Sequence, residues 1–344
     1  MIQAEVLRPS ELSPGDLAAW RSFCASTPAF HNPLLGPDFA LLVGAVRDDA
    51  RVAVFRRAGE TVGILAHHRR PSGFARPIGA AFSDYHAIIT PPGETFDARA
   101  ALAAARISAL RFSGLLDPHG LFGADGVAGE TGYVLKAQTP EAYAERLREA
   151  NTKQFRNWRR LHNKLEREWG EVTLVPGDTS VEAFEQLLSW KRDQFRRTGA
   201  HDVFNPDWAR ELFNRVFEAR EGRLQGAMTT LRAGGKVVAG HFGPRLGPVW
   251  HGWISSIDPA CASSGPGFVL MLQTPEIMAA LELETYDMAP SHEHYKAPFA
   301  TSTVPTREGL TVARSLAGAA AGSLERAWSV GGRKSPAFQL RRRL

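Results

Sequence analysis

The chain has 344 residues, a length that accommodates about two domains, each with its own buried core. Hydrophobic residues make up 44% of the chain and charged residues 22%, values that are ordinary for a folded protein and exclude disorder over most of the length. The formal net charge of +5 favours anionic ligands such as nucleotides, coenzyme phosphates, membrane surfaces or nucleic acid, without choosing among them.

Only two cysteines occur, Cys24 and Cys261, and they are far apart. Neither belongs to a metal-binding spacing, so we expect two reduced thiols rather than a disulfide framework. The N-terminus lacks the basic-then-apolar pattern of a secretory signal, and no apolar run approaches the roughly 18 residues that a membrane span needs. We therefore expect a cytoplasmic protein without a membrane span.

The first half is predicted to combine short helices with a hairpin. Prolines divide residues 12–43 into short helical pieces, because proline interrupts a helix. Two β-rich runs, 51–57 and 61–68, flank a glycine-containing turn and predict a hairpin. An alanine-rich helix is predicted over 98–110. We expect these elements to form an N-terminal domain of residues 1–138.

The second half is predicted to mix helices with strands. The expected helices cover 140–169, 181–197, 207–219 and 268–281, and the expected strands cover 172–175, 224–231, 237–242, 250–257 and 283–288, with a further hairpin ending near residue 312. These elements form a C-terminal domain of residues 139–315. A C-terminal helix and a basic tail follow over 316–344.

One short sequence recurs in the two halves. Residues 58–63 and 234–239 both carry glycine-containing hairpin turns, and each turn precedes an apolar strand that contains histidine. The order of helices and hairpin is also similar in both halves. Together these features predict an internal duplication.

The strongest local pattern is a strand, a loop and a helix within residues 250–281. The loop over 258–267 brings Ser264, Gly265 and Gly267 to the start of the helix. Glycines let backbone amides approach a ligand closely, and the helix dipole favours a pyrophosphate there. The pattern is neither a Walker loop nor a complete GxGxxG motif, and a plain strand-to-helix turn explains it equally well.

A dense polar cluster follows the last predicted buried strand, over residues 286–296. Asp, Glu and His are common general bases, and Tyr can return a proton to a leaving group. A solvated polar turn is an alternative explanation. A metal site formed by His292, Glu293 and His294 is a second alternative, which is disfavoured because a further obvious ligand is lacking.

The helix over 140–169 carries a basic stripe. Arg156, Arg160 and Lys164 lie four residues apart and share one face. They could hold the phosphates of a sugar nucleotide or coenzyme, or bind nucleic acid. A solvated face, with the aromatic residues of the helix in the core, explains the stripe equally well. A DNA-binding protein would be expected to carry a larger net charge.

These motifs resemble those of one known family. The relevant segments are the basic helix over 153–165, residues 80–86, 190–199, 253–259 and 264–267, and the run from Asp287 through Glu293 to Lys296. In this order they resemble the CelD/BcsL family, a group of GNAT-superfamily acetyltransferase-like proteins associated with bacterial cellulose and exopolysaccharide biosynthesis. The resemblance extends over roughly residues 15–305.

The resemblance implies an α/β (α+β) fold with tandem GNAT-like domains. Each domain would be a mixed, mostly antiparallel sheet flanked by helices, as in the Fem-type aminoacyltransferases of peptidoglycan bridges. It also implies acetyl-CoA as the acyl donor. By this analogy Ser264, Gly265, Gly267 and Phe268 would lie at the pyrophosphate of the coenzyme.

The same resemblance implies the catalytic residues. Asp287, Glu293, Tyr295 and Lys296 fall on the Asp…Glu-x-Tyr-Lys pattern of the family. Where that family often has Gly-Asp-Glu-Pro, this chain has His292 at the acidic position, so either Glu293 or His292 would be the base. Tyr295 would protonate the departing thiolate.

The leading hypothesis is transfer of an acetyl or acyl group from acetyl-CoA to an amino sugar or related polysaccharide precursor. The expected acceptor-binding residues are Arg156, Arg160, Trp253 and Lys296, and no metal is expected. An alternative is a Fem-like transferase that uses aminoacyl-tRNA. A second alternative is a catalytically degenerate scaffold that associates with the polysaccharide synthesis machinery.

Overall fold

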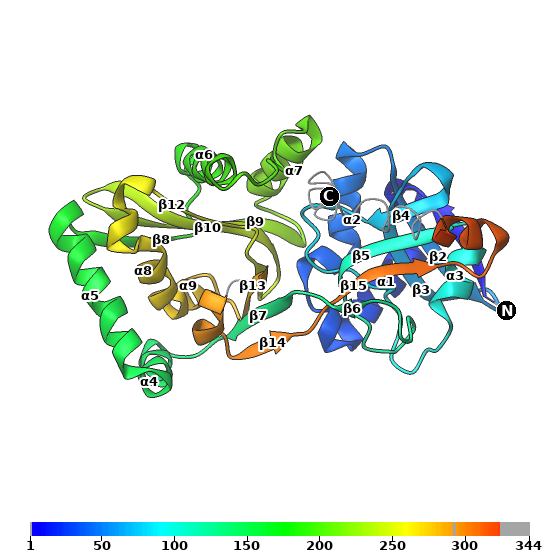
Figure 1. Cartoon of the computed structure of the whole chain (residues 1–344), viewed down its shortest axis with the longest axis horizontal. Coiled ribbons are helices and arrows are strands. Elements are labelled where there is room, and N and C mark those ends of the chain that lie inside the picture. Colours follow the sequence, from blue (N-terminus) through cyan, green and yellow to red (C-terminus); the bar gives the residue numbers. More distant parts are fainter. Residues whose placement is uncertain (1, 292–293, 324–344) are drawn as a thin grey trace. The chain divides into compact units, whose positions relative to one another are not determined.

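The computed structural model describes residues 2–291 and 294–323. Within these residues the chain forms two compact units (Figure 1). The first unit comprises residues 2–131 and 305–323, and the second comprises Gly132–Val304. Each unit is built on one β-sheet with helices packed against it.

The first unit contains a seven-stranded sheet. In spatial order its strands are β1 (Gln3–Leu7), β2 (Ala50–Arg57), β3 (Glu60–Arg69), β4 (Phe74–Pro77), β5 (Ala109–Leu115), β15 (Arg307–Val312) and β6 (Val127–Ala128). Only the β4–β5 pair is parallel. The helices are α1 (Pro14–Ser26), α2 (Pro37–Val46) and α3 (Ala98–Ala104), with short 3₁₀ turns at Pro9–Glu11, Pro28–Phe30, Pro33–Leu35 and Pro71–Gly73.

Local sequence explains where these helices begin and end. The Ser13 hydroxyl caps α1 by accepting the Asp16 amide at 3.1 Å, and a proline opens the first turn of both α1 and α2. The predicted helix over 98–110 was too long, because α3 ends at Ala104. The residues from Ala109 onward instead form β5, which lies in the middle of the sheet between β4 and β15.

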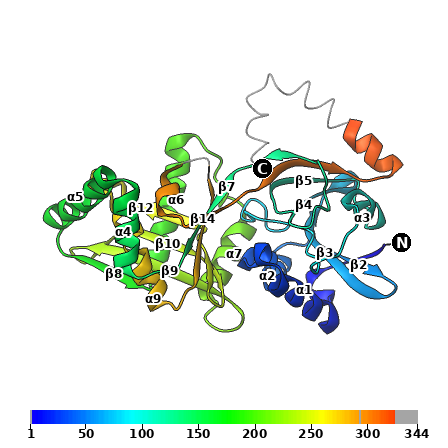
Figure 2. The ribbon, with the colours of Figure 1, turned by 90° about the horizontal axis from the view of Figure 1, so that it is seen from below.

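The second unit contains an eight-stranded sheet. Its spatial order is β14 (Ser302–Val304), β7 (Thr131–Lys136), β13 (Thr285–Ser291), β11 (Val249–His251), β10 (Lys236–Leu246), β9 (Leu224–Ala233) and β8 (Val172–Pro176), and β12 (Ile254–Ile257) also pairs with β10. The helices are α4 (Pro140–Ala150), α5 (Thr152–Trp169), α6 (Val181–Thr198), α7 (Asp207–Glu218), α8 (Pro266–Leu272) and α9 (Thr274–Ala280), with 3₁₀ turns η5 (Pro259–Ser264) and η6 (His294–Phe299). Helices α6 and α7 cover one face of the sheet, and α8 and α9 cover the other (Figures 1 and 2).

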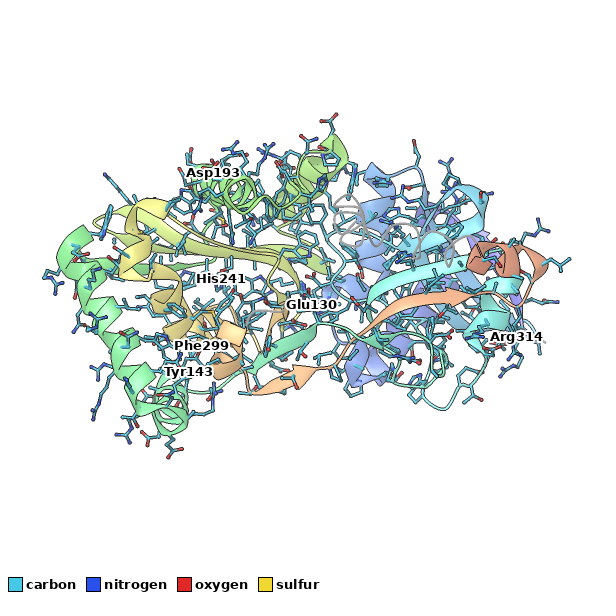
Figure 3. The ribbon with its side chains drawn as sticks, viewed as in Figure 1. Glu130, Tyr143, Asp193, His241, Phe299 and Arg314 are labelled. Atoms are coloured by element: carbon cyan, nitrogen blue, oxygen red, sulfur yellow. The ribbon has the colours of Figure 1, made fainter. Side chains whose placement is uncertain are left out.

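Helices α4 and α5 pack their apolar faces on the outer side of α8 and α9. The predicted helix over 140–169 is interrupted at Asn151, whose side chain accepts the Gln154 amide at 2.9 Å and caps α5. The Trp158 ring lies 4.6 Å from the Phe299 ring, and the Tyr143 hydroxyl donates to the Met271 carbonyl at 2.8 Å. Figure 3 shows Tyr143 and Phe299 in the interior of this unit. The aromatic residues of the basic helix are therefore core residues.

The two units repeat one order of elements. In each, two helices precede a hairpin, and a strand after the hairpin pairs in parallel with a later strand. The two-residue turns at Ala58–Gly59 and Gly234–Gly235 have positive φ at both positions, as in the type I′ turns that suit tight hairpins. The predicted duplication of mixed, mostly antiparallel sheets is confirmed.

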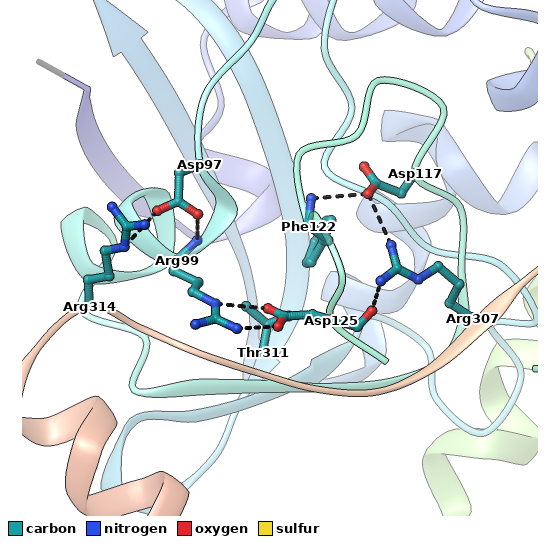
Figure 4. A network of polar contacts seen from close by, with 8 residues as sticks. All are labelled: Asp97, Arg99, Asp117, Phe122, Asp125, Arg307, Thr311 and Arg314. Atoms are coloured by element: carbon teal, nitrogen blue, oxygen red, sulfur yellow. Dashed lines mark hydrogen bonds and ion pairs between the residues drawn. The ribbon is translucent and has the colours of Figure 1, made fainter. Parts of the chain in front are cut away.

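The chain returns to the first unit near its end, which differs from the predicted boundaries at 138/139 and 315/316. The hairpin expected near residue 312 is absent, because β14 pairs with β7 in the second unit whereas β15 pairs with β5 in the first. Side-chain contacts hold β15 in the first unit (Figure 4). The Arg307 guanidinium lies 3.4 Å from the Asp117 carboxylate, and the Thr311 hydroxyl donates to the Asp125 carboxylate at 2.9 Å. The structure thus crosses between units at 131/132 and 304/305.

Both cysteines are free, as predicted. Burial raises the pKa of the Cys24 thiol to about 12 and that of the Cys261 thiol to about 11, so both thiols are unreactive at neutral pH.

Residues 316–323 are helical, and the predicted basic tail lies outside the described residues. None of the described helices is both long and apolar enough to cross a membrane.

Five of the described histidines are buried: His67, His68, His86, His241 and His251. The pKa is lowered most clearly for three of them, His67 on β3, His86 beside β5 and His241 on β10. Burial lowers the pKa of His67 to about 4 and that of His86 to about 3, and burial together with the charge of Lys296 lowers the pKa of His241 to about 3. All three histidines are therefore neutral in the folded protein at pH 7.

The first prediction concerns the attachment of β15. Asp125→Ala removes the partner of Thr311 and Arg99, and we expect the free energy of unfolding to fall by about 1–3 kcal/mol because the buried hydroxyl loses its acceptor. Asp193→Ala is the control, since Asp193 forms only an exposed ion pair with Arg196 on α6 and should cost at most about 0.5 kcal/mol. Urea unfolding measures both losses of free energy. Equal losses in the two variants would contradict the role of Asp125 in attaching β15.

The second prediction concerns pH. His241 has a folded pKa near 3 and an ordinary value of 6.5, so only the unfolded chain gains a proton as the pH falls below 6.5. Stability is therefore lost between about pH 6.5 and about pH 3, with a slope of at most ~1.4 kcal/mol per pH unit from this residue. His241→Gln should be the less stable form at pH 7 and should approach the parent protein on acidification. Urea unfolding of the parent protein and of His241→Gln between pH 3 and pH 7 tests this prediction. A stability difference between the two proteins that stays the same across this range would contradict it.

Candidate functional site

The sheet of the second unit opens at one point. β11 and β13 run parallel, with Trp250 opposite Tyr286 and His251 opposite Asp287. Beyond this pair the strand bends: the Gly252 amide still donates to the Asp287 carbonyl at 2.8 Å, but the Trp253 amide donates to Phe242 of β10. β12 then follows β10, and no pairing joins it to β13 among the described residues. A split therefore lies between β12 and β13.

A glycine is required at the bend. A Cβ atom on Gly252 would lie 2.8 Å from the Tyr286 hydroxyl, closer than real side chains pack. The close approach of the two strands before the split thus depends on the missing side chain at position 252. The loop from Asp258 to Gly265 and helix α8 follow β12, as the strand–loop–helix pattern predicted.

The first unit fills the equivalent opening with its own chain. The amides and carbonyls of Ile64 and Ile89 exchange two hydrogen bonds, and His86 bonds on both sides of Leu115 through Gly114 and Leu116. Residues 86–89 therefore occupy the space between β3 and β5 beyond the end of β4. A Cβ on Gly114 would lie 1.9 Å from the Asp84 carbonyl oxygen, which shows how closely this segment packs. The candidate site is therefore in the second unit.

Asp287 lies at the split, and 4% of its surface is exposed. One carboxylate oxygen accepts the Ala289 amide at 2.8 Å, and the other is 3.6 Å from the His251 Nδ1 atom. Ala289, within β13, has a φ of +64°, so the backbone makes a local turn over Asp287–Ala289 before the strand continues to Ser291. The carboxylate thus holds the turn from which the predicted catalytic residues extend.

Tyr286 and His241 form a buried pair on the opposite face of the sheet. The Tyr286 hydroxyl is 2.8 Å from His241 Nδ1, and the Trp250 ring stacks on Tyr286 with centroids 4.4 Å apart. Burial raises the pKa of Tyr286 well above its ordinary value, so Tyr286 stays protonated. Because His241 is neutral, its tautomer decides which of the two groups donates the shared hydrogen bond.

Lys296 and Tyr295 return to the same strand end from η6. The Lys296 ammonium donates to the Met288 carbonyl at 2.6 Å and lies 3.4 Å from the Ala289 carbonyl. Tyr295 is 38% exposed. The structure therefore brings Asp287 and Lys296 to one turn. Glu293 and His292 lie outside the described residues.

The predicted donor loop is covered by α5. Ser264 is fully buried, and its hydroxyl donates to the Glu168 carboxylate at 2.9 Å. Lys164 donates to the Ser263 carbonyl at 3.0 Å, and Leu161 packs against Gly265. A carboxylate at Ser264 repels phosphate, so this arrangement does not fit a pyrophosphate until Glu168 and Leu161 move. Gly267 and Phe268 are half-buried beside this loop.

The predicted acceptor residues do not form one group. Arg156 and Arg160 are exposed on the face of α5 opposite Trp158. Trp253 is half-buried at the bend after β11, where its ring lies 4.7 Å from the Phe213 ring of α7. Of the four, only Trp253 and Lys296 lie at the split.

Sequence reasoning missed three residues of this region, His241, His251 and Glu168, and it missed the contact of Lys164 with the loop. The two histidines occupy buried strand positions, where a polar residue within an apolar run was the available signal. The roles of Lys164 and Glu168 arise from contacts with a loop about a hundred residues away, which no local pattern reveals. The described residues contain no group of three His, Cys, Asp or Glu side chains arranged to hold a metal ion.

Comparison with known proteins identifies the class of the second unit. Residues 152–297 match the family described as acetyltransferase (GNAT) domain. This region contains the basic helix, the split, the donor loop and the polar cluster. The search of curated proteins finds no match.

Solved structures share the fold over most of the chain. A crystal structure of FemX has a TM-score of 0.54 and 10% sequence identity, with 89% of this chain and 96% of that chain covered. A tandem GNAT protein from the clavulanic acid biosynthesis pathway has a TM-score of 0.51 and 13% identity, with 92% and 99% covered. The predicted tandem GNAT-like fold is thus confirmed. The match of residues 152–297 to a GNAT acetyltransferase domain confirms the predicted acyltransferase class.

Proposed function

We propose that this protein transfers an acetyl group from acetyl-CoA to the amine of an amino sugar or a related polysaccharide precursor in the cytoplasm. The observation that carries the proposal is the split between β12 and β13 inside the GNAT domain, with Asp287 and Lys296 fixed at its edge. The resemblance to CelD/BcsL proteins supports exopolysaccharide biosynthesis as the setting.

The chemistry needs one base and one acid. The amine nitrogen attacks the thioester carbonyl carbon, so that a C–N bond forms and the C–S bond breaks. Glu293 or His292 accepts the amine proton, and Tyr295 gives a proton to the departing thiolate. The exposure of Tyr295 supports this role. Because a neutral amine reacts readily with a thioester, positioning and one base suffice for catalysis.

Asp287 acts in this scheme by holding the strand end. Its carboxylate is occupied by the Ala289 amide and faces His251, so it fixes the turn that leads to residues 292–293. Lys296 supports the same turn from the other side through the Met288 carbonyl. The positions of Trp253 and Lys296 at the split support a role in binding the acceptor. Arg156 and Arg160 are exposed on the outer face of α5, so their positions do not support this role.

The third prediction concerns the donor. Calorimetric titration with acetyl-CoA should show binding that Gly267→Trp abolishes, because the indole would fill the space beside the loop. Glu168→Ala should tighten binding roughly tenfold by removing the carboxylate from Ser264. Glu166→Ala is the matched control, since Glu166 is an exposed carboxylate on the same helix. An absence of binding in every variant would contradict an acetyl-CoA donor and favour the aminoacyl-tRNA or scaffold alternatives.

The fourth prediction concerns the base. Glu293→Gln and His292→Ala are tested separately, and the variant that removes the base should lower kcat about tenfold or more with KM little changed. Glu284→Gln is the control, because Glu284 is an exposed carboxylate just before β13. Unfolding curves check that the fold is intact. Full activity in both variants would contradict the assignment of the base.

A further inference from the structure

One face of α5 carries a line of positive charge. Lys153, Arg156, Arg160 and Arg167 follow one another at spacings of three, four and seven residues, which places them on one side of a helix. We name these four residues the α5 stripe. All four are exposed and lie opposite the buried Trp158. Arg159 and Lys164 flank the stripe.

The charge of the α5 stripe is scarcely neutralised within the protein. Among the described residues, no carboxylate pairs with Lys153, Arg156 or Arg160, and Arg160 bonds only to the Asn157 amide group. Arg167 is 3.6 Å from Glu168, which also accepts from Ser264. Five arginines on other helices of the unit are instead paired with carboxylates: Arg148 with Glu145, Arg192 with Asp202, Arg196 with Asp193, Arg210 with Glu185 and Arg215 with Glu211.

The length of the α5 stripe selects the kind of ligand. From Lys153 to Arg167 the helix rises about 21 Å, at roughly 1.5 Å per residue. A single coenzyme or sugar phosphate could reach only part of such a line. A partner with many negative charges along a surface matches the whole of it.

The side chains around the stripe disfavour RNA. Phe155, Trp158 and Trp169 are buried or half-buried against the core, so α5 offers no exposed aromatic ring on which bases could stack. The major groove of an RNA duplex is too narrow to admit a helix. Helix α5 also lies on the outside of its unit, beyond α8 (Figures 1 and 2). A straight row of exposed cations on the outside of the unit fits a flat anionic surface better than a grooved polymer.

We propose that the α5 stripe docks this protein on the surface of an anionic phospholipid bilayer. The exposed face of α5 consists of polar and charged residues, so the contact is electrostatic, reversible and without insertion into the apolar layer. This inference goes beyond the proposed function and does not rest on it, because it concerns where the protein acts rather than what it transfers.

The test is sedimentation of the full-length protein with phospholipid vesicles. We expect binding to vesicles of phosphatidylcholine with phosphatidylglycerol, no binding to pure phosphatidylcholine, and release by high salt. The double variant Arg156→Gln/Arg160→Gln should lower the partition coefficient by about 25-fold, at roughly fivefold for each charge removed. The matched control is Arg196→Gln/Arg215→Gln, which removes two charges that are already paired and should change binding little.

Two results would overturn the proposal. One is absence of binding to the anionic vesicles, or binding that the stripe variant leaves unchanged. The other is binding to a short RNA hairpin that the stripe variant abolishes while vesicle binding is absent, which would assign the stripe to nucleic acid. Because both substituted arginines are exposed, the variant should unfold at the same urea concentration as the parent protein.

Discussion

The candidate site depends on the point at which two parallel strands stop pairing. Backbone amides and carbonyls in a sheet need partners, so strands that separate must find other ones. In the second unit β12 finds them on β10 after the bend at Gly252, which leaves the end of β13 to be held by side chains, chiefly Asp287 and Lys296. In the first unit residues 86–89 take those hydrogen bonds themselves. One topology therefore yields a unit in which this opening is filled and a unit in which it forms the candidate site.

Helix α5 connects three properties of the second unit. Its apolar side supplies Trp158 and Leu165 to the core. One edge covers the predicted donor loop through Leu161, Lys164 and Glu168, so a ligand would have to replace these contacts. Its outer side bears Lys153, Arg156 and Arg160, none of which pairs with a carboxylate among the described residues. Core packing fixes the helix, and that fixed position determines what its other two sides can do.

Local patterns in the sequence were sufficient for most elements. Alternating apolar residues and glycine-containing turns predicted both hairpins, because the two-residue turns at 58–59 and 234–235 require positive φ. Prolines and capping residues such as Ser13 marked the helix starts. The strand–loop–helix pattern and the polar run after β13 identified the region of the candidate site. In each case the information lay within a few neighbouring residues, which is the range over which backbone preferences act.

Contacts between distant segments decided the rest. The strand β15 is held in the first sheet by contacts of Arg307 with Asp117 and of Thr311 with Asp125. The sequence of β15 alone does not indicate which sheet it joins. The predicted helix over 98–110 ended early because β5 pairs on both sides. Ser264 is bound to Glu168 rather than presented to a phosphate, since α5 packs over its loop. The sequence by itself determined the elements, the duplication and the acyltransferase class. Only the tertiary structure decided which strands pair and which polar groups are already occupied, because both depend on side chains far apart in the chain.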